Sequence, residues 1–266
     1  MRRDWNALPE AVTTEIAERI GGPFEVTPAV TGDHAEIASA VTGPNGTVFI
    51  KAASAETNVL TLRYELAVTK AVGRYPAAVL WDFQSDGWLV VGTEYLDGPH
   101  ADLSPGSPDL DLLAATLTEL QETSAAGRPW FTPEARLGFG HPAMNGGTLV
   151  HSDLNPANLI VTSKGLRIVD WAWATQAASW VELALLVQWL IGSGHDPGQA
   201  EDWLARFPEW TATDPEILDE FASRNAAKWS TKSRQSPQAW VHDLAAWTGN
   251  WAAHRRLRSD RLSGGR

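Results

Sequence analysis

The chain has 266 residues, of which 44% are hydrophobic and 20% are charged, a balance typical of a folded globular protein. The formal net charge of −11 argues against a nucleic acid as partner, because binding a phosphate backbone requires clustered Lys and Arg. The absence of cysteine excludes disulfides, thiolate metal sites and cysteine nucleophiles. No apolar run reaches the roughly 18 residues that span a bilayer, and no secretory signal opens the sequence, so we expect a cytoplasmic protein without a membrane partner.

The first 96 residues change from a helical to an extended pattern. Val12, Ile16 and Ile20 recur at helical spacing before a Gly-Gly-Pro sequence, which predicts a short N-terminal helix. A helix is also predicted over residues 56–72, since apolar residues line one face and Gly73 follows its end. Short alternating or β-branched runs, separated by turn residues, predict five antiparallel strands over residues 24–30, 36–42, 47–52, 77–83 and 88–95.

A turn-rich segment after residue 97 begins a mainly helical region, which predicts a domain boundary between an N-terminal lobe (1–96) and a C-terminal lobe (97–266). Helical periodicity in the second lobe predicts helices over residues 110–120, 181–191, 201–207, 215–229 and 238–258. A β-hairpin interrupts this region, with strands over 159–162 and 166–169 and a turn at Lys164-Gly165. These elements indicate an α+β fold.

Polar residues flank the predicted hairpin at both ends. His151, Asp153 and Asn158 precede it, and Asp170-Trp171 follows it. Because a hairpin returns the chain to its start, we expect Asp153, Asn158 and Asp170 to converge. A carboxylate can accept the proton of an attacking hydroxyl, while an amide oxygen and a second carboxylate are hard donors suited to magnesium. The pattern therefore predicts phosphoryl transfer from a metal-bound triphosphate to a hydroxyl.

This pattern resembles the aminoglycoside phosphotransferase family, a small-molecule branch of the protein-kinase-like fold that also includes choline and fructosamine kinases. The family's His-Gly-Asp-x-x-x-x-Asn and following Asp-Trp or Asp-Phe correspond to His151, Asp153, Asn158 and Asp170-Trp171. The resemblance implies a two-lobe fold, with a five-stranded antiparallel sheet and one helix in the N-terminal lobe and a mainly helical C-terminal lobe. It also implies that Asp153 is the catalytic base and that Asn158 and Asp170 hold Mg²⁺.

The resemblance assigns nucleotide-binding residues in the N-terminal lobe. Lys51, at the end of a predicted strand, corresponds to the lysine that grips the nucleotide phosphates, and Glu65 corresponds to its ion-pair partner. Gly32 and His34 lie between the first two predicted strands, where the family places the loop that covers the phosphates. A plain hairpin turn is the alternative interpretation of this loop.

The same comparison assigns a hinge and two acceptor residues. Glu94, Tyr95 and Leu96 end the fifth predicted strand and correspond to the hinge whose backbone binds the purine, which leaves ATP and GTP both open. Trp173 could wall the acceptor pocket or pack in the core. Glu182 stands where the family has an aspartate near the catalytic loop; it could hydrogen-bond that loop, face an amine-bearing substrate or stabilise its helix dipole.

We therefore expect an ATP-dependent phosphotransferase acting on a small-molecule hydroxyl. The family and the acidic balance favour a cationic acceptor, an aminoglycoside or other antibiotic. The alternatives are a metabolic kinase acting on a sugar, choline-like or amino-alcohol substrate, and a catalytically silent nucleotide-binding homologue. Ser152, where the family usually has glycine, and the glycine-poor loop motivate the silent homologue. A protein kinase is disfavoured because no Ala-Pro-Glu segment follows Asp170.

Overall fold

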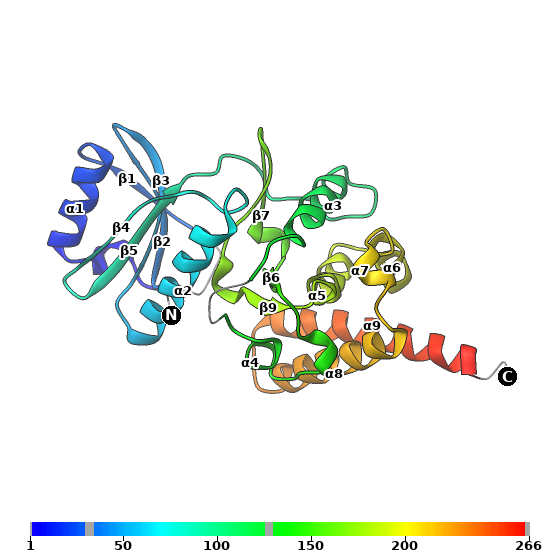
Figure 1. Cartoon of the computed structure of the whole chain (residues 1–266). Helices are drawn as coiled ribbons and strands as arrows, with labels where there is room; N and C mark the ends of the chain where they lie inside the picture. Colours follow the sequence, from blue (N-terminus) through cyan, green and yellow to red (C-terminus); the bar gives the residue numbers. More distant parts are fainter. Residues whose placement is uncertain (1, 30–34, 126–129, 264–266) are drawn as a thin grey trace. The chain divides into compact units, whose positions relative to one another are not determined.

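The contacts of the chain divide it into two compact units, whose elements are labelled in Figure 1. The computed structural model describes residues 2–29, 35–125 and 130–263. The first unit comprises Met1–Pro99 and Leu159–Ala172, and the second comprises His100–Asn158 and Trp173–Arg266. The predicted hairpin therefore groups with the N-terminal part of the chain, while the functional division predicted at residue 96 stays a prediction.

An antiparallel sheet of five strands, counted over the described residues, forms the centre of the first unit, in the order β1-β2-β3-β5-β4. The strands are β1 (Glu25–Pro28), β2 (Ile37–Gly43), β3 (Gly46–Ala53), β4 (Val79–Ser85) and β5 (Trp88–Glu94). Asp86 and Gly87 connect β4 to β5 with φ values of 46° and 78°, the positive angles that a two-residue hairpin turn requires. The predicted sheet is confirmed.

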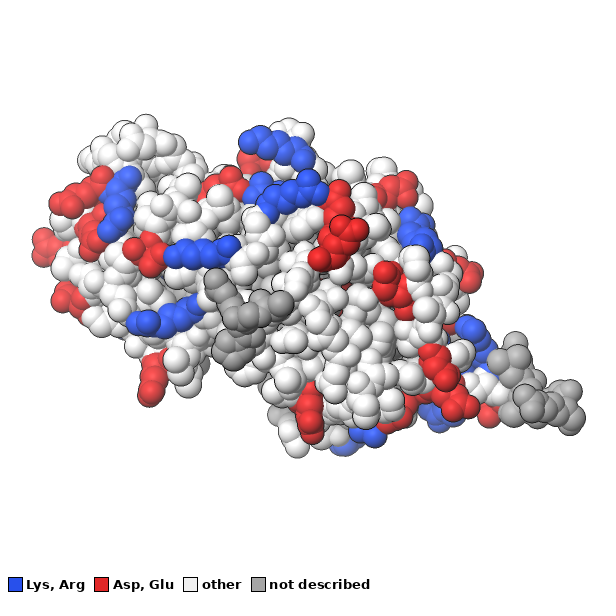
Figure 2. All heavy atoms as spheres, viewed as in Figure 1, with Lys and Arg blue, Asp and Glu red and all other residues white. Residues whose placement is uncertain are grey.

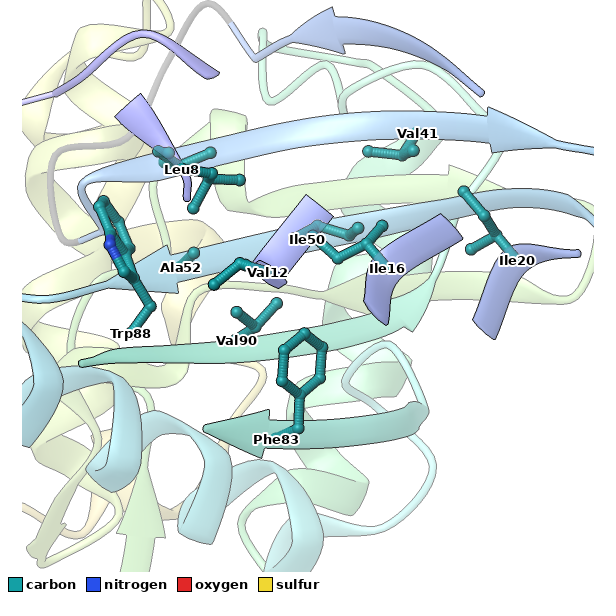
Figure 3. Packing of buried hydrophobic residues seen from close by; sticks show 11 residues of the cluster. Leu8, Val12, Ile16, Ile20, Val41, Ile50, Ala52, Phe83, Trp88 and Val90 are labelled. Atoms are coloured by element: carbon teal, nitrogen blue, oxygen red, sulfur yellow. The ribbon is translucent and has the colours of Figure 1, made fainter. Parts of the chain in front are cut away.

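Helix α1 (Glu10–Ile20) covers one face of this sheet. Val12, Ile16 and Ile20 are fully buried, because their four-residue spacing places them on one side of the helix. Figure 3 shows these side chains directed toward Ile50 of β3 and Val90 of β5. The predicted N-terminal helix is confirmed, and it closes a hydrophobic core against the strands.

Helix α2 (Glu56–Val72) packs on the opposite face. Its Leu62 lies in a cluster with Ala53 of β3, whereas the neighbouring Ala52 belongs to the cluster beneath α1. This division arises because successive strand residues point to opposite faces of a sheet. Lys51, two residues before Ala53, shares the face of Ala53 and is therefore directed toward α2.

The β-hairpin predicted after the polar motif is present and joins the first unit. It consists of β7 (Leu159–Thr162) and β8 (Gly165–Ile168), with Leu159 opposite Ile168. Two backbone hydrogen bonds connect it to the N-terminal part of the chain. The Val161 N–H donates to the Pro99 carbonyl at 2.9 Å, and the Ile168 N–H donates to the Tyr75 carbonyl at 3.0 Å. Each of the two hairpin strands is therefore hydrogen-bonded to the N-terminal part of the chain.

The described part of the second unit is mainly helical. Its helices are α3 (Asp109–Leu120), α4 (Pro133–Leu137), α5 (Trp180–Gly192), α6 (Pro197–Leu204), α7 (Pro208–Thr211), α8 (Pro215–Ser233) and α9 (Ala239–Ser263). Helix α5 is buried on nearly all sides, as its continuous apolar sequence predicts. Two short strands, β6 (Thr148–Val150) and β9 (Thr175–Ala177), pair antiparallel. Single turns of 3-10 helix lie at Trp5–Ala7, Pro142–Met144, Pro156–Asn158 and Trp171–Trp173.

One predicted helix is shifted. The periodicity predicts a helix over 201–207, whereas α6 runs from Pro197 to Leu204. Asp196 sets the start with a capping box: its carboxylate accepts from the Gln199 N–H at 2.8 Å, and the Gln199 side chain accepts from the Asp196 N–H at 2.9 Å. The helix cannot reach the predicted end at residue 207, because Pro208 disfavours the helical conformation for the residue before it, and Phe207 is extended with φ −94° and ψ 123°.

The described residues include no helix with both the length and the apolar character needed to cross a bilayer. On the face in Figure 2, Lys and Arg side chains are interspersed with Asp and Glu.

Candidate active site

Lys51 holds two carboxylates of the first unit. Its Nζ lies 2.6 Å from Oε1 of Glu65 on α2 and 3.0 Å from Oδ1 of Asp170, which follows the hairpin. The three side chains are largely shielded, with 19%, 12% and 15% of their surfaces exposed. The ion pair predicted between Lys51 and Glu65 is present, and Asp170 joins it.

The pKa of Lys51 reflects two opposing effects. Burial alone lowers it, but the nearby charges of Asp170 and Glu65 outweigh burial, so the pKa lies above its ordinary value. Lys51 is therefore a permanent cation at neutral pH. A fixed ammonium group of this kind can neutralise phosphate oxygens without reorganising during a reaction.

In the second unit, a short loop anchors Asp153. Its Oδ2 accepts hydrogen bonds from the side-chain amides of Asn155 at 3.1 Å and Asn158 at 3.2 Å. The Asn158 amide also donates to the Asp153 carbonyl at 2.9 Å. Asn155 in turn accepts from the Ala157 N–H at 2.9 Å, which fixes the turn around Pro156. The loop therefore holds one carboxylate in a defined orientation, as a catalytic base requires.

Glu182 of α5 supports this loop from the core. It is only 2% exposed, and its carboxylate accepts hydrogen bonds from the backbone N–H groups of His151 and Ser152, the latter at 3.0 Å. Burial raises the pKa of Glu182 to about 7, an effect that the two N–H donors oppose and the charge of Asp153 reinforces. The expectation that Glu182 could face a substrate does not fit these contacts, because both oxygens are committed to the loop.

Two non-glycine residues of the site have left-handed backbone conformations. The φ angles are 68° at Ser152 and 62° at Asp170, and Asp86 is the third such residue in the described chain. This region costs an L-residue roughly 1–2 kcal/mol per position. The positive φ explains why glycine would be the usual residue at position 152, and it shows that the serine adopts the same conformation here.

The predicted hinge follows β5. Strand β5 ends at Glu94, so the backbone of Tyr95 and Leu96 lies outside the ladder of the sheet. The Glu94 carboxylate forms an ion pair with Arg167 of β8, a contact that the sequence does not reveal. Tyr95 is 46% exposed and Leu96 is half-buried. The assignment of these residues to a purine stays a prediction.

Of the remaining predicted site residues, the structure describes Trp173 but not Gly32 and His34. Gly32 and His34 lie outside the described residues. Trp173 is half-buried, and the guanidinium of Arg136 lies 5.2 Å from its ring centroid, so it is neither fully exposed nor a core residue. Its role toward an acceptor stays a prediction, as does the convergence of Asp153 and Asn158 with Asp170.

Two residues that support the first unit, Glu36 and Arg167, were not predicted from the sequence. Glu36 follows the loop between the first strands, and its carboxylate caps α2 by accepting from the N–H groups of Ser54 at 2.8 Å and Ala55 at 2.6 Å. The signal for Glu36 was a charged residue at the start of an apolar strand. Arg167 gave no signal, because a charged residue between Leu166 and Ile168 fits a half-exposed strand.

Asn158 of the second unit and Asp170 of the first unit each carry an oxygen of the kind that magnesium binds, and their joint binding of one ion stays a prediction. Among the described residues, no three His, Asp or Glu side chains cluster closely enough to hold a metal alone. Magnesium in phosphoryl transfer takes one or two protein oxygens and completes its shell with phosphates and water. Asp170 offers a carboxylate, and Asn158 directs its amide nitrogen to Asp153, so its oxygen is the remaining donor.

Comparisons with known proteins agree with this chemistry. Residues 141–221, which contain the Asp153 loop and α5, match the phosphotransferase enzyme family (APH). The predicted resemblance is thereby confirmed. No curated protein matches the sequence.

Several solved structures share the fold. LicA in complex with AMP is 16% identical, with 92% of this chain and 98% of that chain covered and a TM-score of 0.62. Choline kinase LicA from Streptococcus pneumoniae is 17% identical, with 95% and 98% covered and a TM-score of 0.56. Aminoglycoside phosphotransferase APH(4)-Ia, as a mutant with ADP and hygromycin B, is 16% identical, with 92% and 98% covered and a TM-score of 0.59. The chain has the protein-kinase-like fold, and the family match identifies residues 141–221 as the part that is similar to phosphotransferase enzymes.

Proposed function

We propose that the protein transfers the γ-phosphoryl group of ATP to a hydroxyl of a small molecule. Asp153 accepts the hydroxyl proton while the new O–P bond forms and the bond between the γ-phosphorus and ADP breaks, giving a phosphate ester and ADP. The observation that carries this proposal is the anchoring of Asp153 by the amides of Asn155 and Asn158. That anchoring fixes a carboxylate next to a residue suited to a metal.

Residues of the first unit bind the nucleotide in this proposal. Lys51, oriented by Glu65, neutralises phosphate oxygens, and the Glu94–Leu96 backbone binds the purine edge. Asn158 and Asp170 hold Mg²⁺, which when bound neutralises charge on the β and γ oxygens. The loop containing Gly32 and His34 covers the phosphates. Adenine nucleotides in the related structures, AMP with LicA and ADP with APH(4)-Ia, favour ATP over GTP.

The favoured acceptor is an amine-bearing alcohol, bound by the lobe of residues 97–266 with Trp173 as a candidate wall. The structures of similar fold include an aminoglycoside phosphotransferase in complex with hygromycin B and a choline kinase. The chain's net charge of −11 suits a cation. An aminoglycoside or other antibiotic is the first candidate, and a choline-like or amino-alcohol metabolite is the second.

A thermal-shift titration with ATP and GTP, each with and without Mg²⁺, tests the nucleotide half of the proposal. We expect Mg²⁺-dependent stabilisation by ATP, because a ligand that binds only the folded state raises its stability. A screen of aminoglycosides, other antibiotics and amino-alcohols for ADP release then tests the acceptor half. No stabilisation by either nucleotide would overturn the proposal and favour a silent homologue.

A further inference from the structure

Arg167 of β8 joins the hairpin to two other segments of the first unit. Its Nε donates to the Tyr75 carbonyl at 3.2 Å, and its Nη2 donates to the Pro76 carbonyl and to the Glu94 carboxylate. The side chain is 16% exposed. One planar guanidinium therefore binds the connection between α2 and β4 and the end of β5.

Glu94, the first residue of the proposed hinge, is fixed on the other side as well. Its Oε1 also accepts from the Ala78 N–H at 3.2 Å, and its own N–H donates to the Ala78 carbonyl at 2.8 Å. The carboxylate thus connects Arg167 to the backbone just before β4. Its orientation depends on both contacts.

The hairpin also contacts the chain just after the proposed hinge. The Val161 N–H donates to the Pro99 carbonyl at 2.9 Å. At Gly98, a Cβ atom would lie 2.0 Å from the Val161 carbonyl oxygen, so only glycine permits this approach. The segment that contains the hinge is therefore bound to the hairpin at both of its ends.

Asp170 lies two residues after the end of β8 and contacts Lys51 at 3.0 Å. The hairpin consequently carries the proposed metal ligand at its end and the hinge anchor, Arg167, within its strand. We infer that Arg167 is a positioning residue that fixes the purine-binding hinge relative to Asp170, an inference that rests on the proposed function. The purine and the magnesium-bound phosphates then bind to parts of one rigid clamp, defined as Tyr75–Ala78, Glu94–Pro99 and the hairpin.

The geometry requires arginine in particular. A guanidinium presents several donors in one plane, whereas a lysine ammonium is a compact charge that cannot reach two carbonyls and a carboxylate in this arrangement. Without the guanidinium, the carbonyls of Tyr75 and Pro76 and the carboxylate of Glu94 would each lose the hydrogen bond that Arg167 donates, at a position shielded from water.

The test compares Arg167→Met and Arg167→Lys with the wild-type enzyme, using the acceptor found in the screen. We expect both variants to raise KM for Mg-ATP about 10-fold, the loss of roughly one charged hydrogen bond, with the acceptor KM within about twofold of wild type. Lys70→Met is the matched control. Lys70 forms a 2.8 Å ion pair with Asp82 in the same unit, but both side chains are exposed, so its KM values should not change.

A second readout does not depend on activity. Hydrogen exchange of the Ile168 and Val161 amides, which donate to Tyr75 and Pro99, should accelerate in Arg167→Met and not in Lys70→Met. If Arg167→Met fails to fold, Glu94→Gln removes the ion pair alone and should raise KM for Mg-ATP in the same direction.

The outcomes distinguish a failure of the proposed function from a failure of the positioning role of Arg167. A wild-type protein that binds no nucleotide overturns the proposed function. Unchanged amide exchange in Arg167→Met, or an equal rise in both KM values, overturns the role of Arg167 even in an active enzyme.

Discussion

The Nζ atom of Lys51 lies 3.0 Å from Oδ1 of Asp170, although 119 positions separate the two residues in the sequence. Glu65 binds the same ammonium at 2.6 Å. One cation therefore holds two carboxylates that would otherwise repel each other. This arrangement makes the lysine a structural residue as well as the proposed phosphate ligand.

Lys51→Met should remove both roles. We expect the free energy of unfolding to fall by about 2–4 kcal/mol at pH 7, because two shielded carboxylates lose their shared cation. In the wild-type protein the pKa of Lys51 is raised, so its stabilisation is fully present below the ordinary value of 10.5 and is lost as the pH rises through the raised pKa. Urea denaturation of the wild-type protein and the variant at pH 7 measures the loss, and an unchanged free energy of unfolding would contradict it.

Asp153→Asn should stop turnover while nucleotide binding persists. The amide cannot accept the hydroxyl proton, so we expect kcat to fall by about 10²–10⁴, the usual contribution of a general base. The Kd of Mg-ATP should stay within about threefold of wild type. Asp202→Asn, at an exposed position of α6, is the control and should retain full activity. Near-native turnover in Asp153→Asn would show that another group accepts the proton.

Glu182 should make stability depend on pH. Its folded pKa of about 7 exceeds the ordinary value of 4.5, so the folded state binds an extra proton between these values. Stability from this group is therefore greatest below about pH 4.5 and falls as the pH rises to about 7, by roughly 3 kcal/mol. Glu182→Gln should abolish this slope, whereas Glu122→Gln, at an exposed site, should keep it. Denaturation curves from pH 4.5 to 7.5 measure the slope, and an unchanged slope in Glu182→Gln would refute the assignment.

Ser152→Gly should relieve backbone strain. Glycine adopts φ of 68° without steric cost, although it also increases the entropy of the unfolded chain. We expect a gain of roughly 0.5–1 kcal/mol in the free energy of unfolding with activity retained. Ser152→Val should lose at least about 1 kcal/mol, because β-branched residues tolerate this region least. Thermal denaturation of the two variants checks the order, and a less stable Ser152→Gly would exclude strain as the explanation.

Arg255→Met should destabilise the second unit. Arg255 is 3% exposed and binds Glu201 at 2.7 Å and Asp219 at 2.5 Å. Removing the guanidinium leaves the buried Glu201 with Arg258 as its remaining ion-pair partner, so we expect a loss of about 3 kcal/mol, the low end for a broken buried pair. Arg206→Met removes an exposed 3.4 Å pair with Asp111 and should cost no more than about 1 kcal/mol. Chemical denaturation measures both, and equal losses would show that burial does not set the cost.

The sequence was sufficient for the features that depend on local pattern. The order of strands and helices in the first unit follows from alternation and from turn residues such as Asp86-Gly87. The contact between Lys51 and Glu65 could be predicted, because strand residues alternate between the two faces of the sheet and Glu65 lies in the helix that follows. The motif containing Asp153 and Asn158 was visible because its residues lie within eight positions of one another.

Contacts between distant side chains were not predictable in the same way. The Arg167–Glu94 pair spans 73 positions, and a single charged residue in a strand usually indicates only a solvated face. Glu182 could not be assigned among its three alternatives, because burial and the partners of a carboxylate depend on how α5 packs. The shift of α6 shows the same limit at a helix boundary, where a capping box outweighed apolar periodicity.

The first unit is discontinuous in sequence, since Leu159–Ala172 return to Met1–Pro99 after the chain has entered the second unit. During synthesis on a ribosome, elongation from residue 99 to residue 172 takes roughly 4–15 s at about 5–20 residues per second. The nascent N-terminal sheet spends that interval without its hairpin. Lys51 therefore meets its second carboxylate late in translation, and the proposed nucleotide-binding surface depends on long-range closure rather than on an early-folding N-terminal domain.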